Sequence, residues 1–209
     1  MASVEWALKR GKDAEQEVQR ELIRLAPRFG FHHLTRLLIA FPWGTSQLDH
    51  VLVDRYGVLV LETKLRRNAV VLGRDVENRW TAHYPATKKN YSLENPLRQN
   101  AEHENALRQA LRDKGLRLKP DFVNSAVVFV GAKSLKLEMH EINAMKVVRL
   151  EQLEKLLARR NDFVINKGDL SRSDVSRLLV ALCELDCSGR PQVARRHEQY
   201  LRERFQEVS

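Results

Sequence analysis

The stretch LDHVLVDRYGVLVLETK, residues 48–64, has the pattern of a β-hairpin. Two apolar runs flank residues 54–57 (DRYG), where Asp and Gly favour a tight turn. Charged side chains interrupt both runs, because Asp49 lies near the start of the first and Glu62 and Lys64 lie at the end of the second. Strands that are apolar on both faces are usually buried, so these charges need an explanation.

The expected register brings the two carboxylates together. If Asp54 pairs with Gly57 across the turn, Asp49 lies directly opposite Glu62, with Cβ atoms about 4.5–5.5 Å apart. Lys64 then shares a strand face with Glu62. Opposed like charges destabilise a strand pair, and a divalent cation between them would offset the repulsion. The alternative is a solvated strand end, and a single-residue bulge at the turn would shift the pairing.

These residue types suit hydrolysis of a phosphodiester. A hard cation such as Mg²⁺ takes oxygen ligands, keeps several waters and binds phosphate oxygens of the substrate. Such an ion activates water and stabilises the charge that develops at phosphorus. An amine beside it can orient the water, help to deprotonate it or hold a phosphate oxygen. Asp49, Glu62 and Lys64 therefore form a candidate phosphodiesterase site.

Apolar periodicity elsewhere predicts a mixed α/β protein. Helices are expected within residues 13–26, 95–115, 147–160, 171–185 and 192–205, and further strands within 31–41, 68–84, 125–132 and at the start of 147–160. Gly73 is expected to turn the chain between two short strands. The inward candidates on the second helix are Leu97, Ala101, Leu107 and Leu111. This order predicts an α/β sandwich with a mixed sheet, followed by a helical extension.

Composition narrows the choice of partner and compartment. Lys and Arg number 36 against 27 Asp and Glu, which gives a net charge of +9. A basic domain of this size suggests a polyanionic partner such as nucleic acid. The two cysteines, Cys183 and Cys187, are too few for a disulfide framework. No apolar run approaches the ~18 residues that span a bilayer, and the first residues lack a secretory pattern, so we expect a cytoplasmic protein without a membrane partner.

Basic residues are concentrated just after the hairpin. Seven lie from Lys64 to Tyr91, against two acidic residues. Such side chains attract phosphate rather than read bases. Tyr84 and Tyr91 are interleaved with them and can stack on unpaired bases, as can Trp80, although Trp80 suits the core better. The candidate contacts with nucleic acid are Arg66, Arg67, Arg74, Lys88 and Lys89.

An Asp on one strand followed by E-x-K on its hairpin partner is the signature of the PD-(D/E)xK nuclease superfamily. The chain resembles one branch of it, the nuclease-related domain or NERD family. The resemblance covers roughly residues 8–132 and rests on GKDAEQEV (11–18), GTSQLDHVLVDRYGVLVLETK (44–64), Trp80 and NPLRQNAEHENAL (95–107). Ala14 departs from it, since a second glycine is common there.

The resemblance implies an α-β-β-β-α-β core with a mixed sheet flanked by helices, plus a C-terminal helical extension. We expect the nuclease domain at residues 8–150 and the extension, packed on the core, at 151–209. Carried over by position, the resemblance also assigns roles to individual residues. It implies Asp49 and Glu62 as metal ligands, Lys64 as the catalytic lysine, Glu15 as an auxiliary acidic residue and Gln99 as a residue that lines the site.

Three neighbouring residues compete with these assignments. Glu17 is an alternative to Glu15 on the first helix. His50 is expected to pack or hydrogen-bond on the opposite strand face from Asp49. His103 shares a helix face with Gln99, so it lies either at the edge of the site or, as we expect, on the surface.

The sequence therefore predicts a nuclease that depends on Mg²⁺ or Mn²⁺, with DNA favoured over RNA by analogy with the superfamily. One alternative is a basic module that binds nucleic acid or recruits a partner without catalysis. Another is a nuclease that is active only with a helicase or other DNA-processing protein in trans, because the chain has no recognisable motor motif. No pattern indicates the oligomeric state.

Overall fold

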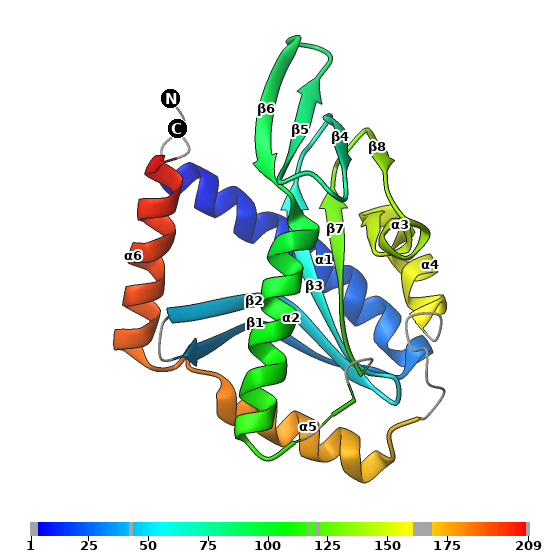
Figure 1. Cartoon of the computed structure of the whole chain (residues 1–209), viewed down its shortest axis with the longest axis vertical. Coiled ribbons are helices and arrows are strands. Elements are labelled where there is room, and N and C mark those ends of the chain that lie inside the picture. Colours follow the sequence, from blue (N-terminus) through cyan, green and yellow to red (C-terminus); the bar gives the residue numbers. More distant parts are fainter. Residues whose placement is uncertain (1–3, 42–43, 117, 120–121, 161–168, 208–209) are drawn as a thin grey trace.

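A computed structural model of the chain describes residues 4–41, 44–116, 118–119, 122–160 and 169–207 (Figure 1). Its elements are α1 (Val4–Phe29), β1 (His32–Phe41), β2 (Gly44–Asp54), β3 (Gly57–Leu65), β4 (Val70–Arg74), β5 (Arg79–Tyr84), β6 (Lys89–Glu94), α2 (Pro96–Asp113), β7 (Val123–Val130), β8 (Ser134–Glu138), α3 (Glu141–Met145), β9 (Val147–Arg149), the 3-10 helix η2 (Leu150–Gln152), α4 (Leu153–Ala158), α5 (Arg172–Leu185) and α6 (Pro191–Glu207). The α/β class is confirmed.

The main sheet has five strands in the order β1-β2-β3-β7-β9. β1, β2 and β3 pair antiparallel, whereas β7 pairs parallel to β3 and β9 parallel to β7. β7 is a nearly continuous apolar run, as expected for a parallel strand covered on both faces. The expected core order of one helix, three strands, one helix and one strand is present, with β4, β5 and β6 inserted before α2.

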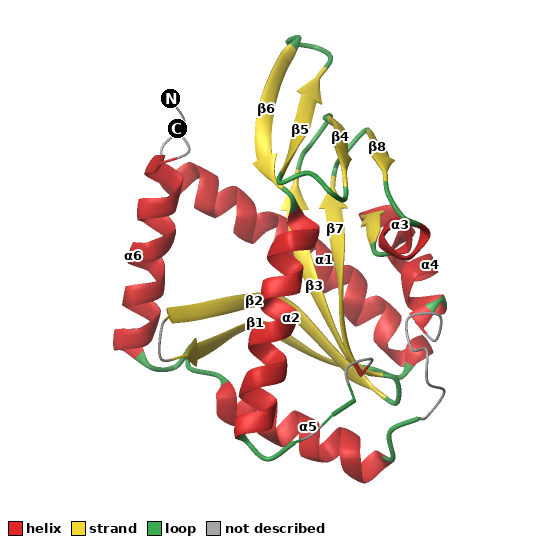
Figure 2. Ribbon diagram, in the orientation of Figure 1, coloured by secondary structure: helices red, strands yellow, loops and turns green. Residues whose placement is uncertain are grey.

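Helices cover both faces of this sheet (Figure 2). α1 and α4 pack on one face, and α2 and α5 pack on the other. On α2, Leu107 and Leu111 are buried as expected, but Ala101 is exposed. Its neighbour Asn100 faces the sheet instead and donates to the carbonyl oxygen of Ala126 at 2.9 Å. No described helix is long and apolar enough to cross a membrane.

A second, four-stranded sheet has the order β6-β5-β4-β8. The turn expected at Gly73 was wrong, because Gly73 lies within β4 opposite Leu137, and the chain turns at residues 75–78. A Cβ on Gly73 would lie 2.3 Å from Cδ1 of Trp80, so glycine makes room for the indole ring. The β5–β6 hairpin projects beyond the rest of the molecule (Figure 1).

The Asn-Pro pair at the start of α2 holds the helix in place. Asn95 is fully buried, and its Oδ1 accepts the N–H of Leu97 at 3.0 Å. Its Nδ2 donates to the carbonyl oxygens of Asp75 at 3.1 Å and Glu77 at 2.7 Å. Pro96 occupies the first helical position, where its missing N–H carries no cost. The first turns of α2 are therefore fixed against the turn between β4 and β5.

Candidate active site

The turn of the β2–β3 hairpin fixes the register on which the site depends. Gly57 has a φ of 100°, a left-handed conformation that glycine adopts without strain. A Cβ there would also lie 2.2 Å from the carbonyl oxygen of Phe122. The Asp54 carboxylate accepts a backbone N–H within the turn at 2.8 Å. Asp54 pairs with Gly57, and the ladder follows the expected register as far as His50 opposite Leu61.

Asp49 lies one residue beyond this ladder, on the side of Glu62. Its Oδ2 accepts the backbone N–H of Thr63 at 2.8 Å, so a side chain serves this N–H in place of a strand carbonyl. The β1–β2 ladder also omits Asp49 and the residue across from it, Arg36, whose φ of 52° is left-handed. Asp49 therefore lacks a ladder partner in either neighbouring strand.

Glu62, Lys64 and Gln99 form one hydrogen-bonded unit. Glu62 is 5% exposed, and its Oε1 accepts from Nζ of Lys64 at 2.6 Å. Nζ of Lys64 also donates to Oε1 of Gln99 at 2.7 Å. Lys64 of the E-x-K motif on β3 thus contacts Gln99 on α2, the residue that the resemblance named, although the two are 35 positions apart in the sequence.

His103 belongs to the same unit, so its expected place on the surface was wrong. Its Nδ1 lies 2.7 Å from Oγ of Ser46. Its Nε2 lies 3.5 Å from Oε2 of Glu62 and 3.3 Å from Nε2 of Gln99. The spacing of four residues between Gln99 and His103 was the available signal, since it puts both on one helix face. That face is the one that packs toward β2 and β3.

Helix α1 brings a third carboxylate toward the strands. Oε2 of Glu15 lies 3.7 Å from Nε of Arg36. This oxygen is buried and has no hydrogen-bond partner among the described residues. Glu15 interacts electrostatically with both Glu62 and Asp49, so each of the three carboxyl groups affects the ionisation of the others. The side chain expected to be auxiliary is therefore close to the predicted ligands.

Burial and like charges set the protonation of these carboxylates. Burial raises the pKa of Asp49 well above its usual value, and the charges of Glu62 and Glu15 add to this. Burial also raises the pKa of Glu15. For Glu62 burial acts in the same direction, but the ammonium of Lys64 and the imidazole of His103 outweigh it and lower the pKa to about 2. Glu62 is ionised at neutral pH, whereas the other two resist ionisation in the absence of a cation.

The residues present fit a hard divalent cation. Carboxylates with raised pKa values and a buried Glu15 oxygen without a donor are the features that such an ion would satisfy. Across the described ranges, no group of three or more His, Cys, Asp and Glu side chains is arranged so that it could hold a metal ion. Mg²⁺ and Mn²⁺ take few carboxylates and fill their coordination shell with water and phosphate oxygens.

Comparison with known families agrees with this geometry. The model of the nuclease-related domain, NERD, matches residues 10–130. This match covers more than half of the chain and contains Glu15, Asp49, Glu62, Lys64 and Gln99. The chain belongs to the NERD family. Its wider context is the PD-(D/E)xK superfamily, as the hairpin indicated.

One relative of this NERD chain is an uncharacterized protein of Bacillus anthracis, which is 32% identical over 99 residues. The aligned part is 47% of this chain and 45% of that protein, so the chain spans less than half the length of the relative it matches. No solved structure matches the chain. Family membership establishes a nuclease-related domain.

The basic side chains expected to contact nucleic acid fall into two groups in this NERD domain. Arg67 and Arg74 form ion pairs with glutamates. Arg66 donates to a backbone oxygen at 2.7 Å, and burial lowers its pKa. Lys88 and Lys89, in contrast, are exposed at the tip of the β5–β6 hairpin. The lysines are therefore better placed to meet a ligand than the arginines.

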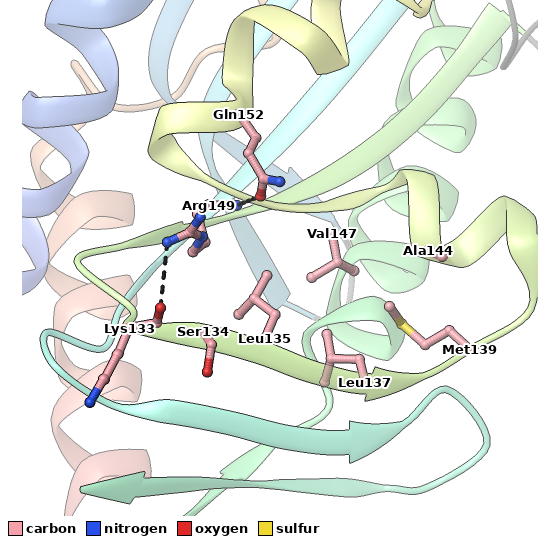
Figure 3. A pocket seen from close by; sticks show the side chains of 9 residues that line it. All are labelled: Lys133, Ser134, Leu135, Leu137, Met139, Ala144, Val147, Arg149 and Gln152. Carbon is pink, nitrogen blue, oxygen red and sulfur yellow. Dashed lines mark hydrogen bonds between the residues drawn. The ribbon is translucent and has the colours of Figure 1, made fainter. Parts of the chain in front are cut away.

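A hollow of about 380 Å³ lies between β8 and β9, away from the candidate catalytic residues. Figure 3 shows Leu135, Leu137 and Val147 pointing into it, while Arg149 at one end donates to the carbonyl oxygen of Lys133 at 3.4 Å. None of the candidate catalytic residues lines it. The polar cluster on β2, β3 and α2, rather than this hollow, is the candidate active site of the NERD domain.

Proposed function

We propose that this NERD protein is a nuclease that depends on Mg²⁺ or Mn²⁺ and hydrolyses phosphodiester bonds of DNA. The proposal rests on the electrostatic interaction of Asp49 with Glu62 and Glu15, beside the hydrogen-bonded Lys64 and Gln99. A protein that only binds DNA gains nothing from carboxylates gathered against their mutual repulsion. A cation-dependent reaction at phosphate uses them, because they share the ion with phosphate oxygens.

Asp49 and Glu62 would hold the ion, with Glu15 as a third carboxylate beside them. When bound, the ion supplies charge stabilisation at phosphorus and lowers the pKa of a coordinated water. Glu62 is already ionised at neutral pH, because its pKa is lowered to about 2 by Lys64 and His103 against the effect of burial. Asp49 ionises once a positive charge is next to it, because such a charge favours the carboxylate form.

Lys64 would position the attacking water or hold a phosphate oxygen. Its Nζ donates to Glu62 at 2.6 Å and to Gln99 at 2.7 Å. An ammonium carries three N–H donors, so one remains for water or substrate. Donors that are fixed in advance stabilise developing charge without reorganisation. Gln99 contributes by positioning Lys64.

A non-catalytic DNA-binding module is the second candidate. The contacts of Glu62 favour it, because its two oxygens already lie 2.6 Å from Lys64 and 3.5 Å from His103. A nuclease that needs a partner in trans would use the same residues as the main proposal. The three candidates differ in whether a divalent ion changes cleavage, binding or both.

The test uses the purified chain with circular and linear DNA, in single- and double-stranded form. Each substrate is incubated with Mg²⁺, Mn²⁺ or EDTA, beside Glu62→Ala and Lys64→Ala. Glu138→Ala and Lys136→Ala, which remove exposed charges from β8, are the matched controls. A separate thermal unfolding series with and without Mg²⁺ reports ion binding independently of activity, with Asp49→Asn as the ligand variant.

Cleavage that needs the ion, is lost in both site variants and persists in both controls would support the nuclease. A rise in the unfolding temperature with Mg²⁺ that Asp49→Asn removes would support the ligand assignment. Cleavage that survives Glu62→Ala or EDTA would exclude the mechanism. Salt-sensitive binding without cleavage, indifferent to the ion, would favour the binding module, and ion-enhanced binding without cleavage would favour the partner-dependent nuclease.

A further inference from the structure

The three aromatic residues after the catalytic hairpin have different places in the fold. Trp80 is 1% exposed, stacks on Phe129 with ring centroids 6.4 Å apart and donates its indole N–H to the carbonyl oxygen of Arg74 at 2.8 Å. Tyr91 is 54% exposed. Tyr84 is half-buried against the core and meets Tyr91 edge-on, with ring centroids 5.5 Å apart and planes at 89°. Trp80 is therefore part of the core. Tyr91 presents an exposed aromatic ring, which packs against Tyr84.

Strand pairing puts this surface and a lysine on one face of the β5–β6 hairpin. Tyr91 pairs with Ala82, and Lys89 pairs with Tyr84. Paired residues share a face, and alternate residues along a strand share it too. This is the face whose base, at Trp80, belongs to the core. Its apolar surface thus continues past the core and ends in two tyrosines and a lysine.

The charges at the tip have no acidic partner within the described ranges. Neither Lys88 nor Lys89 forms an ion pair there, unlike Arg67 and Arg74. Lys88 has a left-handed φ of 54° and forms part of the tight connection. Free ammonium groups beside an exposed ring are the combination that binds a nucleic-acid backbone and a base together.

The chain connects this face directly to the site. β6 runs through Glu94 into α2, which carries Gln99. Tyr91 lies five residues before Pro96, the first residue of α2, a separation of at most about 17 Å along an extended chain. Arg66, two residues after Lys64, interacts electrostatically with Tyr84, which ties the end of the catalytic strand to the same face.

We propose that the β5–β6 hairpin holds an unpaired DNA strand next to the active site, with a base stacked on Tyr91 and the backbone bound by Lys88 and Lys89. The inference rests on the proposed function, because it names the form of DNA presented to that site. An exposed ring favours an unpaired strand, since the faces of bases inside a duplex are covered by their neighbours. Lysines add affinity without base preference.

The experiment measures binding in EDTA by fluorescence anisotropy, with labelled single-stranded DNA, blunt duplex DNA and single-stranded RNA of equal length. The variants are Tyr91→Ala, Tyr91→Phe and the pair Lys88→Ala/Lys89→Ala. The control is Lys136→Ala, an exposed lysine on β8 at the other edge of the same sheet. Circular dichroism checks that each variant is folded, and cleavage by the wild type is assayed separately with Mg²⁺.

We expect Tyr91→Ala to weaken single-stranded DNA binding about tenfold and duplex binding little, with Tyr91→Phe near wild type because the ring is kept. The double lysine variant is expected to reduce the salt dependence of binding, whereas Lys136→Ala leaves it unchanged. Equal losses on single strand and duplex, tighter binding of RNA than DNA, or no effect of Tyr91→Ala would overturn the inference. If the wild type cleaves DNA but gives any of these results, the strand-binding inference fails and the nuclease proposal stands. If Tyr91 contributes to single-strand binding but the wild type does not cleave DNA, the nuclease proposal fails and the strand-binding inference stands.

Discussion

The two ends of the β2–β3 hairpin differ in what surrounds their buried carboxylates. At the turn, Asp54 is 5% exposed and forms a buried ion pair with Arg160, whose guanidinium also lies 3.4 Å from the carbonyl oxygen of Gly57. At the open end, Asp49 receives one backbone N–H and has Glu62 for a neighbour. One end pairs its carboxylate with a guanidinium, and the other gathers three carboxyl groups around a single lysine.

This difference separates a structural carboxylate from a functional one. A buried acid that is matched by one guanidinium holds the chain together and has little charge to offer a ligand. Acids that repel one another cost stability in the isolated protein and are retained where a cation or substrate completes the site. Burial alone does not distinguish the two, because it raises the pKa of both Asp54 and Asp49.

The largest expected effect comes from breaking the balanced end. Arg160→Met should lower the free energy of unfolding by about 3–5 kcal/mol, because it leaves Asp54 buried without its partner. Adding Asp54→Asn should recover much of that loss, since no buried charge then remains. Urea unfolding of the two variants and the wild type measures both effects. If Arg160→Met were as stable as the wild type, the turn would not depend on this ion pair.

Lys64→Ala at the open end should reverse this pattern. Loss of a fixed donor should reduce the cleavage rate by about 10²–10³-fold, as for other preorganised electrostatic groups. Stability should fall by less than in Arg160→Met, because the imidazole of His103 stays 3.5 Å from Oε2 of the buried Glu62 and the Lys64 side chain is partly exposed. Single-turnover cleavage and urea unfolding on the same preparation compare the two. If Lys64→Ala lowered the free energy of unfolding as much as Arg160→Met does, the lost activity would reflect a structural role of Lys64.

Local pairing explains why the hairpin was predictable. Its register follows from four turn residues, so Asp49, Glu62 and Lys64 could be placed together from the sequence. The second sheet was not predictable in the same way, because β4 pairs with β8, which follows only after α2 and β7. Gly73 was misread for a different reason, because the glycine makes room within β4 for the indole of Trp80 on β5.

Long-range packing also decided which helix residues reach the site. Helical periodicity groups Gln99 with His103 but does not show which face of α2 meets the strands. The cap at Asn95 and the bond from Asn100 to β7 set that rotation. Ala101 was consequently misplaced in the core, and His103 was misplaced on the surface.

A smaller loss of activity is expected from His103→Gln. The imidazole lies between Ser46 at 2.7 Å and Glu62 at 3.5 Å, so it orients a predicted ligand without binding substrate itself. Removing such supporting contacts costs about 10–100-fold in metal affinity or activity. The measurement is the cleavage rate across a Mg²⁺ titration, and a positioning role requires that excess Mg²⁺ restore part of the rate. His32→Gln, which replaces an exposed histidine at the start of β1, is the control.

The smallest effect concerns the opposite face of β2, where His50 hydrogen-bonds His33 at 3.1 Å, as expected for a residue outside the site. Burial lowers the pKa of His50 from 6.5 to about 3 and that of His33 from 6.5 to about 4. The unfolded chain takes up these protons near pH 6.5 while the folded chain stays neutral. Their stabilisation is therefore complete above pH 6.5 and is lost as the pH falls from there toward 4, by about 1.4 kcal/mol per pH unit for the buried His50.

The acids at the open end oppose this trend. The raised pKa of Asp49, caused mainly by burial, means that protonation of its folded form stabilises the protein as the pH falls. In EDTA, His33→Asn should flatten the decline in stability between pH 6.5 and 5, because fewer protons are taken up on unfolding. Asp49→Asn should steepen it, because the compensating protonation is gone. Urea unfolding at three pH values gives the slopes, and parallel curves for the three proteins would mean that neither group titrates differently on folding.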